Sequence, residues 1–208
     1  MNNPWDKYVT SWSKEPGGMV QASTERWKGT HFAEDWLRAL SGVALEVGPG
    51  GGRQTSILME CCGAVDVIDV SQVILDVVVA ALPIRKAYLA EMYKEPPEEV
   101  PCGYDAFVAN YVFCHSRIID VWRYLKFAAK HVRKGGMVLF DVKQVDRDTW
   151  EDFFQYHLEP VDRIGSGVFN IKPISDEVVH CMCNSAGLQV VERRVYPLGN
   201  VAYKTQVM

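Results

Sequence analysis

A cluster of glycines between an apolar run and an expected helix is the feature that most restricts how this chain can fold. Val43–Val47 is a short apolar segment, and residues 48–52 read Gly-Pro-Gly-Gly-Gly. A helix is expected over 53–62, ending at Gly63. Glycines in such a turn let the backbone approach a ligand closely, and the helix start offers free N–H groups and a positive dipole end. The segment therefore predicts a nucleotide-like ligand at the carboxyl edge of a sheet.

The rest of the chain alternates short apolar runs with helical segments. Further strands are expected over residues 64–69, 87–90, 104–112 and 137–140, and further helices over 71–81, 117–132 and 175–186. Strands 188–196 and 201–207 should form a C-terminal hairpin with at least one antiparallel strand. Nearly continuous apolar strands separated by helices indicate a parallel sheet covered on both faces. We therefore expect an α/β fold, a Rossmann-like three-layer sandwich whose seven-stranded sheet is mostly parallel.

Two regions do not follow this alternation. Residues 1–42 hold four of the six tryptophans, namely Trp5, Trp12, Trp27 and Trp36. A helix is expected over 30–40, and the aromatic side chains could either cover a ligand or pin this segment to the core. Residues 146–170 match no simple pattern, and an inserted helix and loop is expected there. The chain thus divides into a helical cap or lid over 1–42 and one domain over 43–208.

The spacing of the glycines distinguishes between possible ligands. A dinucleotide fingerprint would place Arg53 where Gly or Ala is needed, and no phosphate-binding Gly-Lys-Ser or Gly-Lys-Thr occurs. The spacing is instead Glu46-x-Gly48-x-Gly50-x-Gly52, which resembles the first motif of class I S-adenosylmethionine-dependent methyltransferases. In that family the acidic residue lies near the methionine part of the cofactor. A carboxylate suits a ligand with an ammonium and a sulfonium group, and would repel a pyrophosphate.

Later segments resemble the same family in the expected order. The second strand ends at Asp69, followed by Val70 and Ser71, and the resemblance implies that the Asp69 carboxylate accepts hydrogen bonds from the ribose hydroxyls. Glu91 and Met92 fall where the family has an acidic residue and an apolar neighbour at the adenine, although a solvated charge is the alternative. Further matches are the fourth strand at 104–110, the fifth at 134–140 and the entry to the last pair at 186–190.

The resemblance implies S-adenosylmethionine as the cofactor. It assigns cofactor binding to Glu46, Gly48, Pro49, Gly50, Gly52, Asp69, Val70, Glu91, Met92 and Asn110. The end of the fourth strand, Asn110-Tyr111-Val112, lacks the D/N-P-P-Y/F motif of adenine-specific DNA methyltransferases. Asn110 also stands where aminopropyltransferases usually have an acidic residue. We therefore expect methyl transfer to a small-molecule acceptor.

The expected reaction is an in-line attack of the acceptor on the activated methyl group. The protein then mainly aligns and desolvates the reactants. A general base helps only where the acceptor must lose a proton. His115, just past the fourth strand, is the candidate catalytic residue, although a loop histidine bonded to backbone is the simpler interpretation. His31 and Tyr111 are lesser candidates, while His131 is expected on a helix surface and His157 lies within 146–170.

The charge, the apolar runs and the cysteine content indicate which kinds of partner and which cellular compartment to expect. The formal net charge of −4 disfavours nucleic acid as a partner. No apolar run approaches the roughly 20 residues needed to span a bilayer, and the N-terminus lacks the features of a signal peptide, so a cytoplasmic protein without a membrane partner is expected. The six cysteines show no C-x-x-C spacing, and no metal site is expected.

Three alternatives to a small-molecule methyltransferase stay open at this point. The chain could methylate protein or RNA, although it lacks a basic tract. It could be a catalytically silent protein that binds S-adenosylmethionine as a scaffold. An NAD-linked oxidoreductase is disfavoured by Arg53. The oligomeric state does not follow from the sequence.

Overall fold

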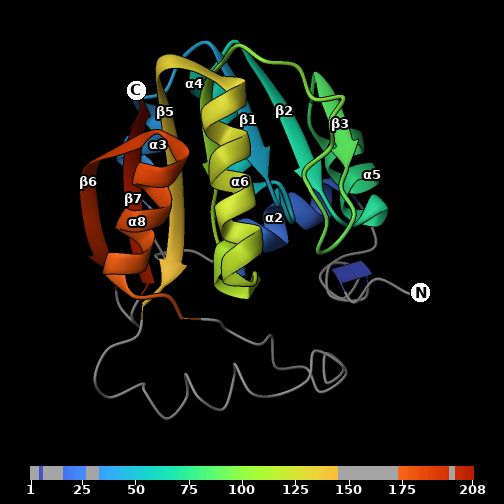
Figure 1. Cartoon of the computed structure of the whole chain (residues 1–208). Helices are drawn as coiled ribbons and strands as arrows, with labels where there is room; N and C mark the ends of the chain where they lie inside the picture. Colours follow the sequence, from blue (N-terminus) through green and yellow to red (C-terminus); the bar gives the residue numbers. More distant parts are fainter. Residues whose placement is uncertain (1–4, 7–15, 27–32, 145–172, 197–199) are drawn as a thin grey trace.

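A seven-stranded sheet forms the centre of the molecule (Figure 1). The computed structural model describes residues 5–6, 16–26, 33–144, 173–196 and 200–208. The strands are β1 (Val43–Val47), β2 (Ala64–Asp69), β3 (Lys86–Leu89), β4 (Tyr104–Ala109), β5 (Val132–Lys143), β6 (Leu188–Tyr196) and β7 (Asn200–Val207). Their order is β3-β2-β1-β4-β5-β7-β6; β7 runs antiparallel to β5 and β6, and the other adjacent pairs are parallel. The expected α/β fold with its C-terminal hairpin is confirmed.

Helices cover both faces of this sheet (Figure 1). The described helices are α2 (Pro16–Arg26), α3 (Glu34–Arg38), α4 (Arg53–Cys61), α5 (Gln72–Ala81), the short 3-10 helix η1 (Phe113–His115), α6 (Ile118–His131) and α8 (Asp176–Ala186). On one face α6 and α8 bury Leu125 and Val179 against the strands. On the other face α4 and α5 bury Leu58 and Leu75.

Serine residues cap the starts of two helices, and a glycine ends one of them. The Ser71 side chain accepts a hydrogen bond from the N–H of Ile74 at 3.2 Å and so caps α5. Ser175 caps α8 in the same way, accepting from the N–H of Val178 at 3.4 Å. Gly187 ends α8 with a φ of +83°, a conformation that glycine adopts without steric cost. These caps depend on contacts between near neighbours in the sequence.

Some expected boundaries were wrong. The fourth strand ends at Ala109 and not at residue 112, because Tyr111 has a φ of +53°, which no strand residue adopts. The fifth strand begins at Val132 and not at 137, with a register shift opposite Tyr104. His131 was expected on a helix surface but is buried, and its ring stacks on Phe127 with centroids 3.9 Å apart.

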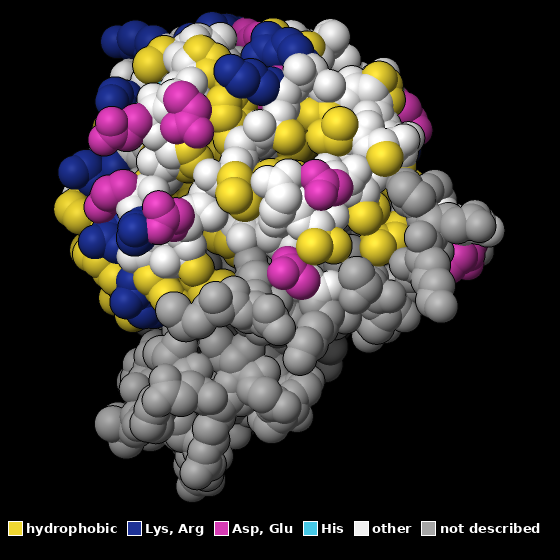
Figure 2. Space-filling model, turned by 90° about the vertical axis from the view of Figure 1, so that its right-hand side faces the viewer, with side chains coloured by type: hydrophobic (Ala, Val, Ile, Leu, Met, Phe, Trp, Pro, Cys, Tyr) yellow, Lys and Arg dark blue, Asp and Glu magenta, His cyan; other side chains and the backbone are white. Residues whose placement is uncertain are grey.

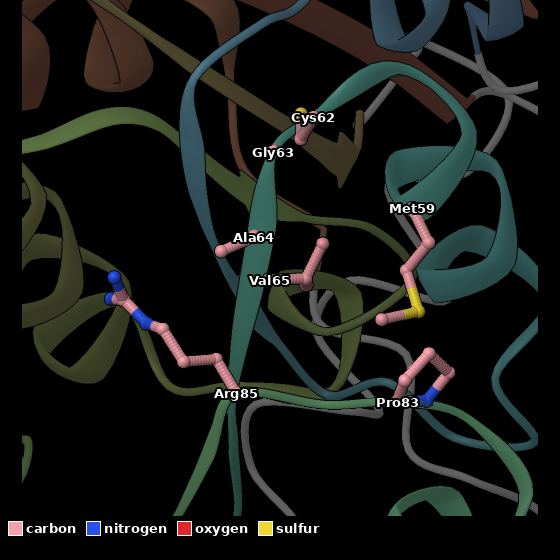
Figure 3. A pocket seen from close by; sticks show the side chains of 7 residues that line it. All are labelled: Met59, Cys62, Gly63, Ala64, Val65, Pro83 and Arg85. Atoms are coloured by element: carbon pink, nitrogen blue, oxygen red, sulfur yellow. The ribbon is translucent and has the colours of Figure 1, made fainter.

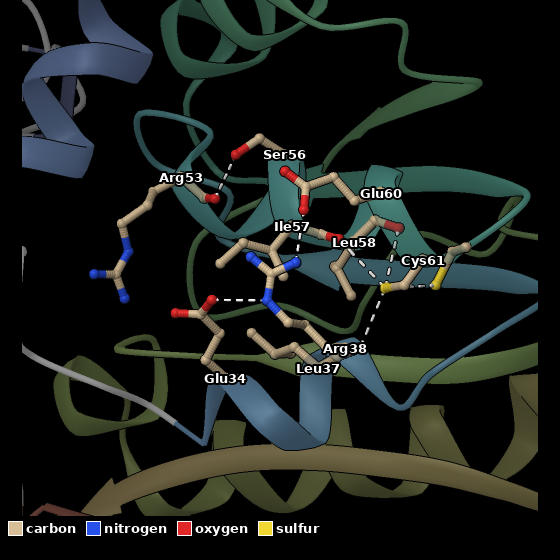
Figure 4. Close-up of polar contacts among 10 residues, drawn as sticks. Glu34, Leu37, Arg38, Arg53, Ser56, Ile57, Leu58, Glu60 and Cys61 are labelled. Carbon is tan, nitrogen blue, oxygen red and sulfur yellow. Dashed lines mark hydrogen bonds and ion pairs between the residues drawn. The ribbon is translucent and has the colours of Figure 1, made fainter.

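The described parts of the N-terminal segment pack against the α4 and α5 face. Arg38 of α3 bonds to Glu60 of α4 at 2.6 Å and to Glu34 at 2.8 Å (Figure 4). Trp36 is buried in the same cluster as Leu58. In α2, the buried Met19 contacts α5. Trp12, Trp27, the start of the expected helix at 30–40 and the whole of 146–170 lie outside the described residues.

Candidate active site

Three carboxyl side chains share one face of the sheet at the carboxyl ends of its strands. Glu46 of β1 is in register with Val67 of β2 and with Val108 of β4. Asp69 lies two residues after Val67, so it points to the same side as Glu46. Leu139 of β5 is the partner of Val108, and Asp141 lies two residues beyond it. Glu46, Asp69 and Asp141 therefore line one edge across β2, β1, β4 and β5.

Glu46 is a buried acid with no counter-ion among the residues that the structure describes. Its side chain is 2% exposed, and its Oε2 atom has no hydrogen-bond partner among the described residues. Burial raises the pKa of Glu46 to about 7, while Thr55 opposes the rise and the charge of Asp69 adds to it. Such a group is stabilised when a cation or a hydrogen-bond donor reaches it.

Asp69 is held at the end of β2 by the following turn. Its Oδ1 atom accepts a hydrogen bond from the N–H of Ser71 at 2.8 Å. Burial raises the pKa of Asp69 to about 7, against the opposing effect of the Ser71 and Val70 N–H groups. The hydroxyl of Ser71 donates to Asp6 at 2.5 Å, so the N-terminal segment reaches this end of the sheet.

Asp141 was missed by the sequence analysis. It is 1% exposed, and burial raises its pKa to about 7. Its Oδ1 atom accepts a hydrogen bond from the N–H of Tyr111 at 2.7 Å. A signal for it existed, since Asp141 is a lone charge in the otherwise apolar run 137–142. A charged residue inside a buried strand needs a structural or functional reason.

The glycine loop lies beside these carboxyl groups. Gly50 has a φ of +54°, and a Cβ atom added there would meet no atom of the described residues within 4 Å. The backbone at Gly50 is therefore open to an approaching ligand. A Cβ atom on Gly48 would lie 2.4 Å from the Val112 side chain, so the loop and the segment after β4 are in close contact. Pro49 lies between Gly48 and Gly50, and its carbonyl accepts a hydrogen bond from the N–H of Gly52 at 2.9 Å.

The remaining residues of the expected cofactor site differ in how deeply their side chains are buried. Asn110 follows β4, and its Oδ1 atom is buried with no hydrogen-bond partner in the described part of the chain. The N–H of Ala90 bonds to the carbonyl of Asp69 at 2.8 Å, which brings the loop after β3 to the end of β2. Met92 is half-buried there, whereas Glu91 is 69% exposed and forms an ion pair with Lys94.

His115 lies in η1, at the same edge of the sheet. Its ring meets that of Trp5 edge to face, with centroids 5.4 Å apart. Tyr111 is half-buried, and burial raises the pKa of its hydroxyl. His31 and His157 lie outside the described residues. The structure thus brings His115 and Tyr111 to the same side of the sheet as the glycine loop.

A separate cavity of about 420 Å³ lies at the opposite edge (Figure 3). It is lined by Met59, Cys62, Gly63, Ala64, Val65, Pro83 and Arg85. These residues surround the start of β2, so they are remote from the carboxyl ends of the strands. Arg85 in this cavity is already paired with Asp66 at 2.6 Å.

Neither a metal site nor a membrane span is found in the described regions. There, no three His, Cys, Asp or Glu side chains gather in a way that could hold a metal ion. No described helix is long and apolar enough to cross a membrane. On the face shown in Figure 2, Lys and Arg side chains are interspersed with Asp and Glu.

Comparison with known proteins identifies the domain. Residues 45–140 match the family described as "Methyltransferase domain". Together with the strand order, this match identifies a class I methyltransferase domain. The chain carries an S-adenosylmethionine-dependent methyltransferase domain, and the cofactor of this family is S-adenosylmethionine. No match to the chain was found among curated protein sequences.

Solved structures share the fold at low sequence identity. One of them is a chain from the complex between the Haloferax volcanii Trm112 methyltransferase activator and a protein described as a methyltransferase. That chain is 14% identical, with a TM-score of 0.72 over 100% of this chain and 99% of that one. A protein from Bacillus halodurans described as a methyltransferase is 17% identical, with a TM-score of 0.62 over 78% and 70%. The mitomycin 7-O-methyltransferase MmcR is 13% identical, with a TM-score of 0.65 over 100% and 61%.

Proposed function

We propose that the carboxyl edge of β1, β2 and β4 binds S-adenosylmethionine and that the protein methylates a small molecule. The observation that carries this proposal is the pair of buried acids at that edge, Glu46 and Asp69. In the described part of the chain neither of them pairs with a lysine or arginine. A ligand that brings an ammonium and a sulfonium group supplies the missing positive charge.

The residues at this edge fit the cofactor. The unpartnered Oε2 atom of Glu46 suits the cofactor ammonium group, and Asp69 suits the ribose hydroxyls. The open backbone at Gly50 lets the ligand approach without displacing a side chain. The proposed cofactor-binding set is Glu46, Gly48, Pro49, Gly50, Gly52, Asp69, Val70, Glu91, Met92 and Asn110. Within it Glu91 has the weakest support, because its carboxylate is solvent-exposed and already paired.

The cofactor, when bound, supplies a methyl group that its sulfonium already activates. The chain's own residues then align the acceptor with that methyl group and exclude water. His115 takes a proton from acceptors that must lose one, since it lies at the same edge of the sheet. Trp5 lies against His115, which supports a role for the N-terminal segment at the acceptor side.

Further contacts support the division into a cap over 1–42 and a methyltransferase domain over 43–208. A Cβ atom on Gly51 would lie 2.6 Å from the Ser23 side chain, so α2 packs directly on the glycine loop. Asp6 accepts a hydrogen bond from Ser71 at 2.5 Å. Both contacts support a position of the N-terminal segment beside the edge where the ligand is proposed to bind.

A small acceptor is favoured by the charge and by one structural relative. The net charge is −4. A chain of that charge has no general attraction for nucleic acid. The mitomycin 7-O-methyltransferase MmcR, which shares the fold, is named for a small-molecule acceptor. These observations favour a small molecule over protein or RNA.

Isothermal titration with S-adenosylhomocysteine, with NADH as the control ligand, tests the proposal. We expect a dissociation constant on the order of micromolar for the first and no binding of the second. Mutation of Glu46→Gln should weaken binding while the protein stays folded. Binding of NADH alone, or of neither ligand, would contradict the proposed site. A panel of small-molecule acceptors then tests the choice of acceptor, against RNA and protein as competitors.

A further inference from the structure

Tyr111 adopts a backbone conformation that only glycine adopts easily. Its φ of +53° lies in the left-handed region, where the Cβ of other residues is crowded. Asp141 of β5 is positioned to hold this conformation, because its Oδ1 atom accepts the Tyr111 N–H at 2.7 Å. The carboxyl group is 1% exposed, so water does not compete for this hydrogen bond.

The turn at Tyr111 sets the positions of two neighbours at the proposed cofactor site. Asn110, on one side, has a buried Oδ1 atom without a partner in the described residues. Val112, on the other side, packs so closely on Gly48 that a Cβ atom on that glycine would lie 2.4 Å from it. A change in the conformation of Tyr111 would therefore move groups on both sides of the glycine loop.

We infer that Asp141 is a positioning residue, which fixes the left-handed turn at Tyr111 and thereby holds Asn110 and Val112 against the glycine loop. This inference rests on the proposed function, because it assigns Asp141 an effect on cofactor binding. Asp141 acts through the backbone of Tyr111 and is not itself a catalytic residue.

Two variants of Asp141 test the hydrogen bond. Asp141→Ala removes the acceptor, and we expect it to weaken S-adenosylhomocysteine binding by about tenfold, the loss typical of one hydrogen bond to a charged group. Asp141→Asn keeps a carbonyl oxygen in the same place and should restore most of the affinity. Asp66→Ala is the matched control, since Asp66 is equally buried but faces Arg85 and Tyr104. It should lower the melting temperature without changing the affinity.

A double-mutant cycle with Tyr111→Gly separates positioning from stability. Glycine adopts the left-handed conformation without help, so adding Asp141→Ala to Tyr111→Gly should cost little further affinity. Equal losses with tyrosine and with glycine at position 111 would overturn the inference, as would an Asp141→Ala variant that binds like the wild type.

Amide hydrogen exchange of Tyr111 tests the same hydrogen bond without any ligand. We expect faster exchange in Asp141→Ala and near wild-type protection in Asp141→Asn. Unchanged exchange in Asp141→Ala would overturn the inference even where the wild type binds the ligand. If exchange is faster in Asp141→Ala but the wild type binds no S-adenosylhomocysteine, the proposed function fails while the hydrogen bond is supported, and the effect of Asp141 on cofactor binding is then overturned.

Discussion

The rings of Trp5 and His115 meet edge to face, with centroids 5.4 Å apart, although 110 positions separate the two residues in the chain. This contact brings the N-terminal segment to the histidine that sequence analysis selects as a general base.

For an acceptor that must lose a proton, His115→Ala should lower kcat by roughly 100-fold, the smaller effect typical of a lost general base. The affinity for S-adenosylhomocysteine should change little, because His115 is not in the proposed cofactor-binding set. Steady-state kinetics and isothermal titration measure the two quantities. His180→Ala is the control, since His180 lies on α8 and is paired with Asp176. An unchanged kcat in His115→Ala would exclude this histidine as the base.

Asp69→Ala should weaken S-adenosylhomocysteine binding by about tenfold or more, because it removes the buried carboxylate proposed to accept hydrogen bonds from the ribose hydroxyls. Asp76→Ala is a suitable comparison, since Asp76 is exposed on α5 and bonds only to Gln72 among the contacts described. Titration calorimetry on both variants, after circular dichroism has verified folding, measures the effect. Equal affinities would remove Asp69 from the proposed ribose site.

Binding of S-adenosylhomocysteine should strengthen as the pH rises from 6 to 8. The pKa of Glu46 is raised to about 7, so its carboxylate forms in this range and attracts the ammonium group of the ligand. Glu46→Gln should bind more weakly and show a flatter pH profile. Calorimetric titrations at several pH values, in buffers of matched ionic strength, give the two profiles. Parallel profiles for the two proteins would contradict the assignment.

The raised pKa of Glu46 should also make the ligand-free protein less stable at higher pH. A pKa near 7 in the folded state exceeds the usual value of 4.5 for Glu46, so the folded protein retains a proton that the unfolded chain releases. This group therefore destabilises the fold progressively from about pH 4.5 to pH 7. We expect the melting temperature of Glu46→Gln to exceed that of the wild type more at pH 8 than at pH 5. A constant difference would show that Glu46 has an ordinary pKa.

Alanine at the two central glycines should have different consequences. Gly48→Ala places a Cβ atom 2.4 Å from Val112 and should lower the stability markedly, because the two segments must separate. The Cβ atom of Gly50→Ala meets nothing within 4 Å in the described part of the chain, so this change should cost only about 1 kcal/mol for the left-handed conformation. It should nevertheless weaken ligand binding, since the added methyl group occupies the open space. Thermal melting measures the stability of the two variants, and calorimetry measures their affinity for S-adenosylhomocysteine. Similar stabilities would contradict the close contact at Gly48.

The parts of the fold that depend on near neighbours could be predicted from the sequence. The glycine loop, the caps at Ser71 and Ser175, and the C-terminal hairpin all follow from local patterns. The left-handed turn at Tyr111 could not be predicted, since it depends on a hydrogen bond that the Tyr111 N–H donates to Asp141 of the neighbouring strand β5. The contact between Trp5 and His115 is equally non-local. The site was thus predictable where one segment forms it and not where distant segments meet.

The strand order has a consequence for how such a protein can change. The sheet winds outward from the β1–β4 pair, so β2 and β3 lie on one side of it and β5, β7 and β6 on the other. The segments after β1, β2 and β3 supply most of the residues proposed for the cofactor, while the segment after β4 lies on the other side. The two halves are therefore encoded by separate stretches of the gene. Changes after β4 would therefore act on the proposed base His115, and they would spare the cofactor half only where Asn110 and the turn at Tyr111 are kept.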